Sequence, residues 1–318
     1  MSIQAVENIL SLLILIAVGY FASGRKWFGN TGGSFLSKLV SKVTLPCFLA
    51  NNVYTSFDTP RELLDVVVNL PLPFLLLAVM LGAGLALCRA AGVRPPRRGV
   101  FINAFTFGNS VLVGFPVTLA LLGEEALPYA MVYYMANTIT FWSVGMYLLR
   151  SDSGERVRFF SFANLRKIFS LPILALIVGI VLVLLDVTLP TVIASPLRSL
   201  GSVTSPLAMI FIGHVIRQAD LRALALSKDL ILVLVSRFLL SPLAAALVCV
   251  LLPMGNMMRR VVMVMSIMPA MTQLSIMSKE TGSDYEYASL LVAVTSIISM
   301  CLLPVFAFVL EHLALFPV

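Results

Sequence analysis

The chain has 318 residues, of which 59% are hydrophobic and only 12% charged, and its mean hydropathy is +1.00. A soluble domain carries roughly 25% charged residues, so this supply of charge is too small to cover a surface that faces water. The composition predicts a membrane protein and excludes a soluble fold, a disordered chain and a collagen. The four cysteines, Cys47, Cys88, Cys249 and Cys301, stand singly without a C-x-x-C pair, so no metal or redox cluster is expected.

Apolar stretches divide the chain from one end to the other. A helix that spans a bilayer needs about 20 mostly apolar residues. Ten such stretches are predicted, at residues 6–22, 35–53, 67–88, 100–122, 129–149, 168–185, 195–216, 230–252, 261–277 and 288–310. The longest polar connection is residues 150–167, so no soluble domain is expected between the helices.

The basic residues predict how these helices are oriented. Connections that follow an odd-numbered stretch hold 17 Lys and Arg, Lys42 among them, whereas even-numbered connections hold three: Arg61, Arg259 and Arg260. The positive-inside rule places the odd connections in the cytoplasm and both termini outside the cytoplasmic (inner) membrane. The basic pI of 9.4 is therefore interpreted as a topology signal, and no nucleic-acid partner is expected.

Short matches at a nearly constant offset indicate an internal repeat. Val43-Thr44-Leu45-Pro46 recurs 160 residues later as Val203-Thr204-Ser205-Pro206, and Arg97-Arg98 recurs 162 residues later as Arg259-Arg260. Five helices per half is an odd number, so the second half enters the membrane from the opposite side. The prediction is an inverted five-plus-five repeat of residues 1–150 and 167–318, joined by a cytoplasmic linker at 151–166. Many secondary transporters are built in this way.

The fourth and ninth stretches are the least regular. Gly108 lies ten residues after Arg98, and Pro269 lies nine residues after Arg260, so both interruptions are expected at equivalent depth from opposite faces. Glycine weakens a helix locally and proline removes a backbone donor. The half-helices that follow would present N-termini, which carry partial positive charge and suit an anion such as a carboxylate. The alternative is a pair of tolerated kinks, since Gly and Pro are common in membrane helices.

Several motifs resemble one transporter family in order and spacing. They are Thr44-Leu45-Pro46-Cys47-Phe48, Asn109-Ser110-Val111-Leu112-Val113-Gly114-Phe115-Pro116, Ser236-Arg237-Phe238 with Pro242, and Met268-Pro269 followed by Ser278-Lys279-Glu280. Over essentially its whole length the chain resembles the auxin efflux carrier family, which includes the plant PIN proteins. Plant members commonly have proline where this chain has Gly108, and glutamine where it has Ala270, with Gln273 one turn further on. The long cytoplasmic loop of many plant members is absent from this sequence.

The resemblance implies an all-α fold of ten helices with crossing, broken helices 4 and 9. It implies a scaffold domain of helices 1, 2, 6 and 7, often dimeric, so a second copy of the chain is an expected partner. Helices 3–5 and 8–10 would form a transport domain that moves like an elevator and carries small organic anions. The fold is related to that of the bile acid and sodium symporters.

The candidate site residues lie at and around the two breaks. Gly108, Asn109, Pro269 and Ala270 are predicted to form the crossover, and Asn109, Ser110, Asn137, Thr272 and Gln273 to supply polar contacts. Asn109 could also cap its half-helix at the same time, and Asn137 could either bind the ligand or tie two helices together. Arg237 is an intramembrane charge that either serves function or snorkels to the cytoplasmic face. His214 is expected to be structural.

All 15 acidic residues fall in loops or near helix ends, so no carboxylate is expected in mid-membrane to couple transport to a cation. Backbone carbonyls could still hold sodium. The prediction is an exporter of a small organic anion, such as an auxin-like carboxylate or a dicarboxylate, in the lipid bilayer and without a cofactor. The alternatives are a sodium-coupled uptake carrier, a channel, or a membrane-embedded enzyme. The enzyme lacks support because the two histidines, His214 and His312, lie on different predicted helices.

Overall fold

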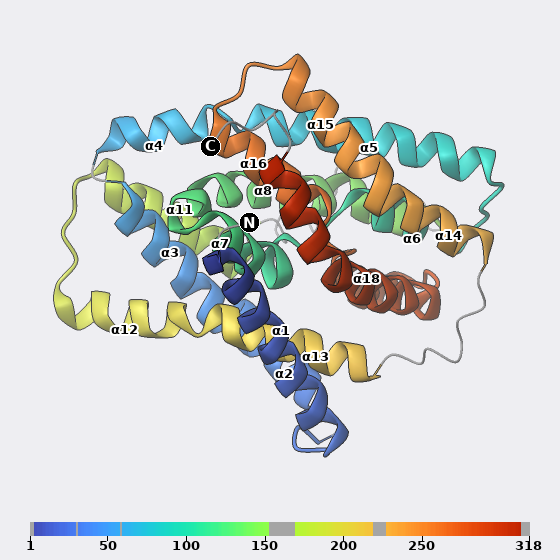
Figure 1. Ribbon diagram of the computed structural model, residues 1–318, viewed down its shortest axis with the longest axis horizontal. Coiled ribbons are helices and arrows are strands. Elements are labelled where there is room, and N and C mark those ends of the chain that lie inside the picture. The colour runs from blue at the N-terminus through green and yellow to red at the C-terminus, as the bar shows by residue number, and fades with distance from the viewer. Residues whose placement is uncertain (1–2, 30, 58, 153–168, 219–226, 313–318) are drawn as a thin grey trace.

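The computed structural model describes residues 3–29, 31–57, 59–152, 169–218 and 227–312, and it is built of helices (Figure 1). Among these residues there is no β-strand, only one isolated antiparallel bridge between Gly108 and Ala270. The prediction of an all-α fold is confirmed. The predicted linker at 151–166 falls outside the described residues apart from its first two positions.

The described elements follow the order of the predicted stretches. The elements up to residue 152 are α1 (Ile3–Gly24), α2 (Gly32–Leu39), η1 (Val40–Thr44), α3 (Leu45–Ser56), α4 (Pro60–Val67), α5 (Pro71–Ala90), α6 (Arg98–Thr106), η2 (Ser110–Gly114), α7 (Phe115–Leu122), η3 (Glu124–Ala126), α8 (Leu127–Thr140), η4 (Phe141–Gly145) and α9 (Met146–Asp152). Those from residue 171 are α11 (Leu171–Leu184), α12 (Thr191–Ser202), α13 (Thr204–Gln218), α14 (Lys228–Val235), η6 (Ser236–Leu240), α15 (Ser241–Leu251), α16 (Asn256–Ser266), α17 (Gln273–Thr281) and α18 (Tyr285–His312).

Five helical segments of the described chain are long and apolar enough to cross a membrane. They are Glu7–Gly24, Pro60–Ala90, Thr191–Gln218, Lys228–Leu251 and Tyr285–Val309. Two shorter apolar helical segments, Ser110–Leu122 and Leu171–Leu184, accompany them. The ten-helix inverted repeat stays a prediction.

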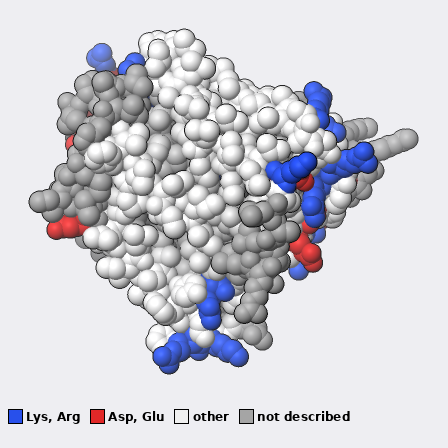
Figure 2. All heavy atoms as spheres, turned by 45° about the vertical axis from the view of Figure 1, so that its right-hand side comes forward, with Lys and Arg blue, Asp and Glu red and all other residues white. Residues whose placement is uncertain are grey.

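The surface of the molecule carries many large apolar side chains. On α15, for example, Leu243, Leu247 and Val250 are each more than half exposed. Figure 2 shows a broad central area without Lys, Arg, Asp or Glu, and the charged side chains on this face gather towards its edges. An apolar surface of this extent suits contact with lipid, because hydrocarbon does not penalise the exposure of apolar side chains.

Prolines explain three of the π-helical segments. η1, η2 and η6 each end two residues before a proline, at Pro46, Pro116 and Pro242 respectively. Because proline cannot donate a backbone hydrogen bond and its ring crowds the preceding turn, the helix widens before it. Such π-helical bulges are frequent at functional sites, and these three hold Lys42, Ser110 and Arg237.

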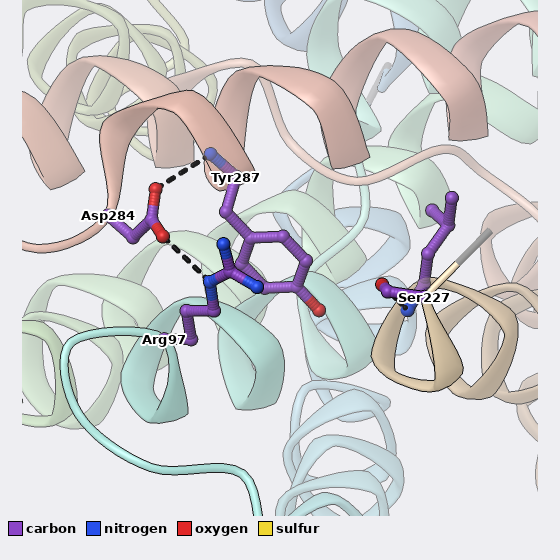
Figure 3. A network of polar contacts seen from close by, with 5 residues as sticks. Arg97, Ser227, Asp284 and Tyr287 are labelled. Atoms are coloured by element: carbon purple, nitrogen blue, oxygen red, sulfur yellow. Dashed lines mark hydrogen bonds and ion pairs between the residues drawn. The ribbon is translucent and has the colours of Figure 1, made fainter. Parts of the chain in front are cut away.

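A polar network joins the loop before α6 to the start of α18 (Figure 3). Arg97 Nε lies 2.8 Å from Asp284 Oδ2, and its guanidinium lies 5.0 Å from the ring centroid of Tyr287. Asp284 Oδ1 accepts a hydrogen bond from the backbone N–H of Tyr287 at 2.9 Å and so caps α18. The hydrogen bond with Asp284 raises the pKa of Arg97 above its usual value. Ser227, labelled in the same view, caps α14 through Leu230 N at 3.2 Å.

Replacing Asp284 by alanine is expected to lower the free energy of unfolding by about 1–2 kcal/mol, because α18 loses its N-cap and Arg97 loses its partner. Thermal unfolding of the purified protein measures this. The control is Glu286→Ala, which removes an exposed carboxylate from the first turn of α18 and leaves the cap in place. Equal melting temperatures for the two variants would contradict the capping role.

Candidate functional site

The two predicted breaks lie against each other. Phe107 to Asn109 separate α6 from η2, and Ile267 to Thr272 separate α16 from α17. The two segments pair in antiparallel fashion: Asn109 N donates to Pro269 O at 2.7 Å, and Met271 N donates to Phe107 O at 3.2 Å. Each interrupted segment thus satisfies backbone groups of the other. We call this pairing the crossover.

Asn109 connects the N-termini of the two half-helices that leave the crossover. Its Oδ1 accepts a hydrogen bond from Leu112 N at 3.1 Å, which caps η2. Its Nδ2 donates to Thr272 Oγ1 at 2.9 Å, and Thr272 is the residue at the N-cap of α17. The predicted capping role of Asn109 is confirmed.

Asn137 comes from α8 and ties this helix to the first break. Its Nδ2 donates to Gly108 O at 3.1 Å and to Ser110 Oγ at 3.5 Å. Its Oδ1 is buried and has no hydrogen-bond partner. Of the two roles left open for Asn137, the tie between helices is confirmed, and ligand binding stays a prediction.

The second break is held in a similar way from α18. Ala270 N donates to Thr295 Oγ1 at 3.0 Å, and Ser299 Oγ donates to Ile267 O at 3.1 Å. Thr295 lies 158 residues after Asn137, close to the offset of the predicted repeat. Sequence reasoning missed Thr295 and Ser299, although that offset from Asn137 could have drawn attention to Thr295.

A cavity of about 460 Å³ opens beside the crossover. Its size falls within the range of small-molecule sites. Six of the eight predicted site residues line it: Gly108, Asn109, Ser110, Asn137, Thr272 and Gln273. The other two, Pro269 and Ala270, belong to the crossover but do not line the cavity. The remaining lining residues come mainly from α2, η1, α8 and the start of α11, and include Ser37, Ser41, Lys42, Tyr134, Trp142 and Ser170.

Among the described residues that line the cavity, Lys42 is the one with a charged side chain, and none carries a carboxylate. Sequence analysis counted Lys42 with a cytoplasmic connection, but the structure places it inside η1, within the continuous helical run from α2 to α3. The signal that could have found it is Pro46, four residues later, because a proline inside an apolar stretch marks a local widening of the helix.

Arg237 does not snorkel. It lies in η6, is 1% exposed, and its guanidinium donates to backbone carbonyl oxygens at the crossover. His214, by contrast, lies on α13 and forms a 3.0 Å hydrogen bond through Nδ1 with Ser23 Oγ of α1, away from the lining of the cavity. Within the described part of the chain no group of three or more His, Cys, Asp or Glu side chains is placed to hold a metal ion.

Helical spans, paired helix breaks and a cavity beside those breaks are features of membrane carriers, and sequence comparison agrees. Residues 4–307 match the family described as membrane transport proteins. The chain belongs to this family, the auxin efflux carrier-like family that its motifs resemble.

Two archaeal relatives cover nearly the same length. An uncharacterized transporter of Methanothermobacter thermautotrophicus is 27% identical over 306 residues, 96% of this chain and 98% of the relative. An uncharacterized transporter of Methanocaldococcus jannaschii is 26% identical over 299 residues, 90% of this chain and 91% of the relative. The prediction of a membrane transport protein is confirmed.

Proposed function

We propose that the protein is a secondary transporter that exports a small organic anion across the inner membrane by alternating access, with the anion bound in the cavity beside the crossover. The observation that carries the proposal is the charge of this cavity. Lys42 contributes a cation, the N-termini of η2 and α17 lie at its wall, and none of the described residues that line it is acidic.

The electrostatics favour an anion over a cation or a neutral ligand. Each helix N-terminus carries partial positive charge, roughly half of an elementary charge in a regular helix. Ser110 and Gln273, the first residues of η2 and α17, both line the cavity. Together with Lys42 they make this region electropositive, and within the described part of the chain no lining carboxylate offsets it.

The wall of the cavity also indicates what kind of anion fits. A single lysine matches one carboxylate better than two. Leu45, Trp142, Met271 and Ile276 supply apolar surface for the rest of the ligand. A monocarboxylate with an apolar, partly aromatic body therefore fits better than a compact dicarboxylate.

Alternating access requires two bodies with the site between them. The cavity is bounded on one side by α2, η1, α3 and the start of α11, and on the other by the crossover, α8 and α17. The first group belongs to the predicted scaffold, helices 1, 2, 6 and 7, and the second to the predicted transport domain, helices 3–5 and 8–10. Within the predicted scaffold, α3 packs on α11 and α12, and α1 packs on α13. This arrangement supports an elevator-like movement of the crossover past the scaffold.

The test is transport by purified protein in liposomes with a panel of labelled monocarboxylates, dicarboxylates and uncharged analogues. Saturable movement of aromatic or apolar monocarboxylates is expected, and movement of none of the panel would reject the proposal. A requirement for sodium would favour the sodium-coupled alternative, and flux that does not saturate would favour a channel.

Asn109→Ala is expected to reduce this transport about tenfold or more, because the variant uncaps η2 and breaks its link to Thr272. The control is Asn69→Ala, which removes an amide that bonds only Asp65 O and Val66 O near the start of α5. Transport should be unchanged in the control. Equal transport by Asn109→Ala and the wild type would show that the crossover amide is not part of the site.

A further inference from the structure

The face of the crossover opposite to the half-helix N-termini is formed by helix C-termini. α6 ends at Thr106 and α16 ends at Ser266. The guanidinium of Arg237 lies between these ends: Nε donates to Met268 O at 2.5 Å, and Nη1 donates to Phe105 O and Thr106 O, both at 3.2 Å. One side chain from η6 thus contacts the last turn of α6 and the unwound segment that follows α16.

These carbonyl groups are the counter-charge of Arg237. No carboxylate of the described residues forms a hydrogen bond or ion pair with it. A buried charge is costly unless it is compensated. The C-terminus of α6, whose Phe105 O and Thr106 O accept from Nη1, carries partial negative charge, and Met268 O, two residues beyond the end of α16, adds a third acceptor.

The predicted repeat supplies this cation in only one of its halves. The position 160 residues before Arg237 is Leu77, an equally buried apolar residue of α5. Gly108 leaves the room that the guanidinium occupies, because a Cβ at that position would fall on Nη2 of Arg237. One arginine therefore donates hydrogen bonds to carbonyl oxygens of both interrupted segments.

We propose that Arg237 is a fixed cation of the crossover, standing among carbonyl oxygens where a bound alkali cation could otherwise lie. Unwound backbone carbonyls and half-helix C-termini hold Na⁺ in some secondary transporters. With the guanidinium in this place the crossover needs no metal ion to be stable. On the basis of the function proposed above, the crossover of this carrier also moves without such an ion at this position.

The test compares melting temperatures of purified wild type, Arg237→Ala, Arg237→Met and Arg237→Lys in NaCl, KCl and N-methyl-D-glucamine chloride at equal ionic strength. The wild type and Arg237→Lys should melt at the same temperature in all three salts. Arg237→Ala should melt about 5–10 °C lower in N-methyl-D-glucamine chloride, because three carbonyls lose their donor. NaCl or KCl should restore part of that loss with a saturable dose response, and so should low millimolar guanidinium.

Arg237→Met separates charge from space. It fills the space with an apolar chain, so its melting temperature should fall and no cation should restore it. Leu77→Ala is the matched control, since it removes a buried side chain at the equivalent position without changing a charge. It should be destabilised and show no response to the choice of cation.

Three results would overturn the proposal: a wild type stabilised by sodium or potassium over N-methyl-D-glucamine, equal cation responses of Arg237→Ala and Leu77→Ala, or an Arg237→Met variant as stable as the wild type. If Arg237→Ala cannot be purified in any salt, the wild type, Arg237→Lys and Arg237→Met decide the question. None of these measurements depends on transport. Failure of the anion assay and failure of this proposal are therefore distinguishable.

Discussion

Lys42→Gln is expected to raise the concentration of monocarboxylate needed for half-maximal transport by about tenfold or more. The variant removes the one cationic side chain among the described lining residues. A hydrogen bond to a charged group is typically worth enough to change an affinity by that factor. Concentration-dependent uptake into liposomes measures the effect. Folding should be preserved because Lys42 is exposed and glutamine has high helix propensity.

Lys38→Gln is the matched control for this prediction. Lys38 lies one turn before Lys42, on α2, is likewise exposed and does not line the cavity. The two variants change the net charge equally, so a general effect of surface charge on anion approach would appear in both. If Lys38→Gln and Lys42→Gln weakened transport to the same degree, Lys42 would not be part of the binding site.

Gly108→Ala is expected to lower the free energy of unfolding by about 1–3 kcal/mol and to reduce transport strongly. The added Cβ would fall on Nη2 of Arg237 and lie 3.3 Å from Met268 Cβ. The guanidinium has little freedom to move away, because three carbonyl oxygens hold it. Overpacking of a close-packed interior typically has a cost of this size. Thermal unfolding and transport are the two measurements.

Gly82→Ala controls for the exchange of glycine for alanine as such. Gly82 lies on α5, and no atom lies within 4 Å of a Cβ built at this position. In a helix alanine is favoured over glycine by about 0.5–1 kcal/mol, so this variant should be slightly more stable than the wild type. A loss of stability in both variants would show that the close contact with Arg237 is not the cause.

Much of the fold could be predicted from the sequence because its determinants are local. The length of each apolar run and the scarcity of charge indicate membrane helices before any contact is known. Gly108 and Pro269 mark the breaks because each weakens the helix in which it stands. The capping role of Asn109 was predictable for the same reason, since the capped N–H of Leu112 is only three residues away.

The partners of the buried polar groups could not be predicted in the same way. Arg237 bonds Phe105 O, 132 residues earlier in the chain, and Asn109 bonds Thr272, 163 residues later. The pattern around Arg237 was equally compatible with a side chain that reaches the membrane surface. Whether Arg237 is buried or reaches the membrane surface depends on whether other helices cover it. The sequence of a single helix does not carry that information.

By itself, then, the sequence determined that this is a helical membrane protein, where its helices are interrupted, and which polar residues stand beside the interruptions. Only the tertiary structure decided that the two breaks pair and that Lys42 lines the cavity on one side of them. It also decided that Arg237 donates hydrogen bonds to backbone carbonyl oxygens on the other side of the crossover. The physical reason is that helix breaks follow from the covalent chemistry of single residues. The charge of the cavity, and the carbonyl groups that compensate Arg237, come from segments that meet only when the chain is folded.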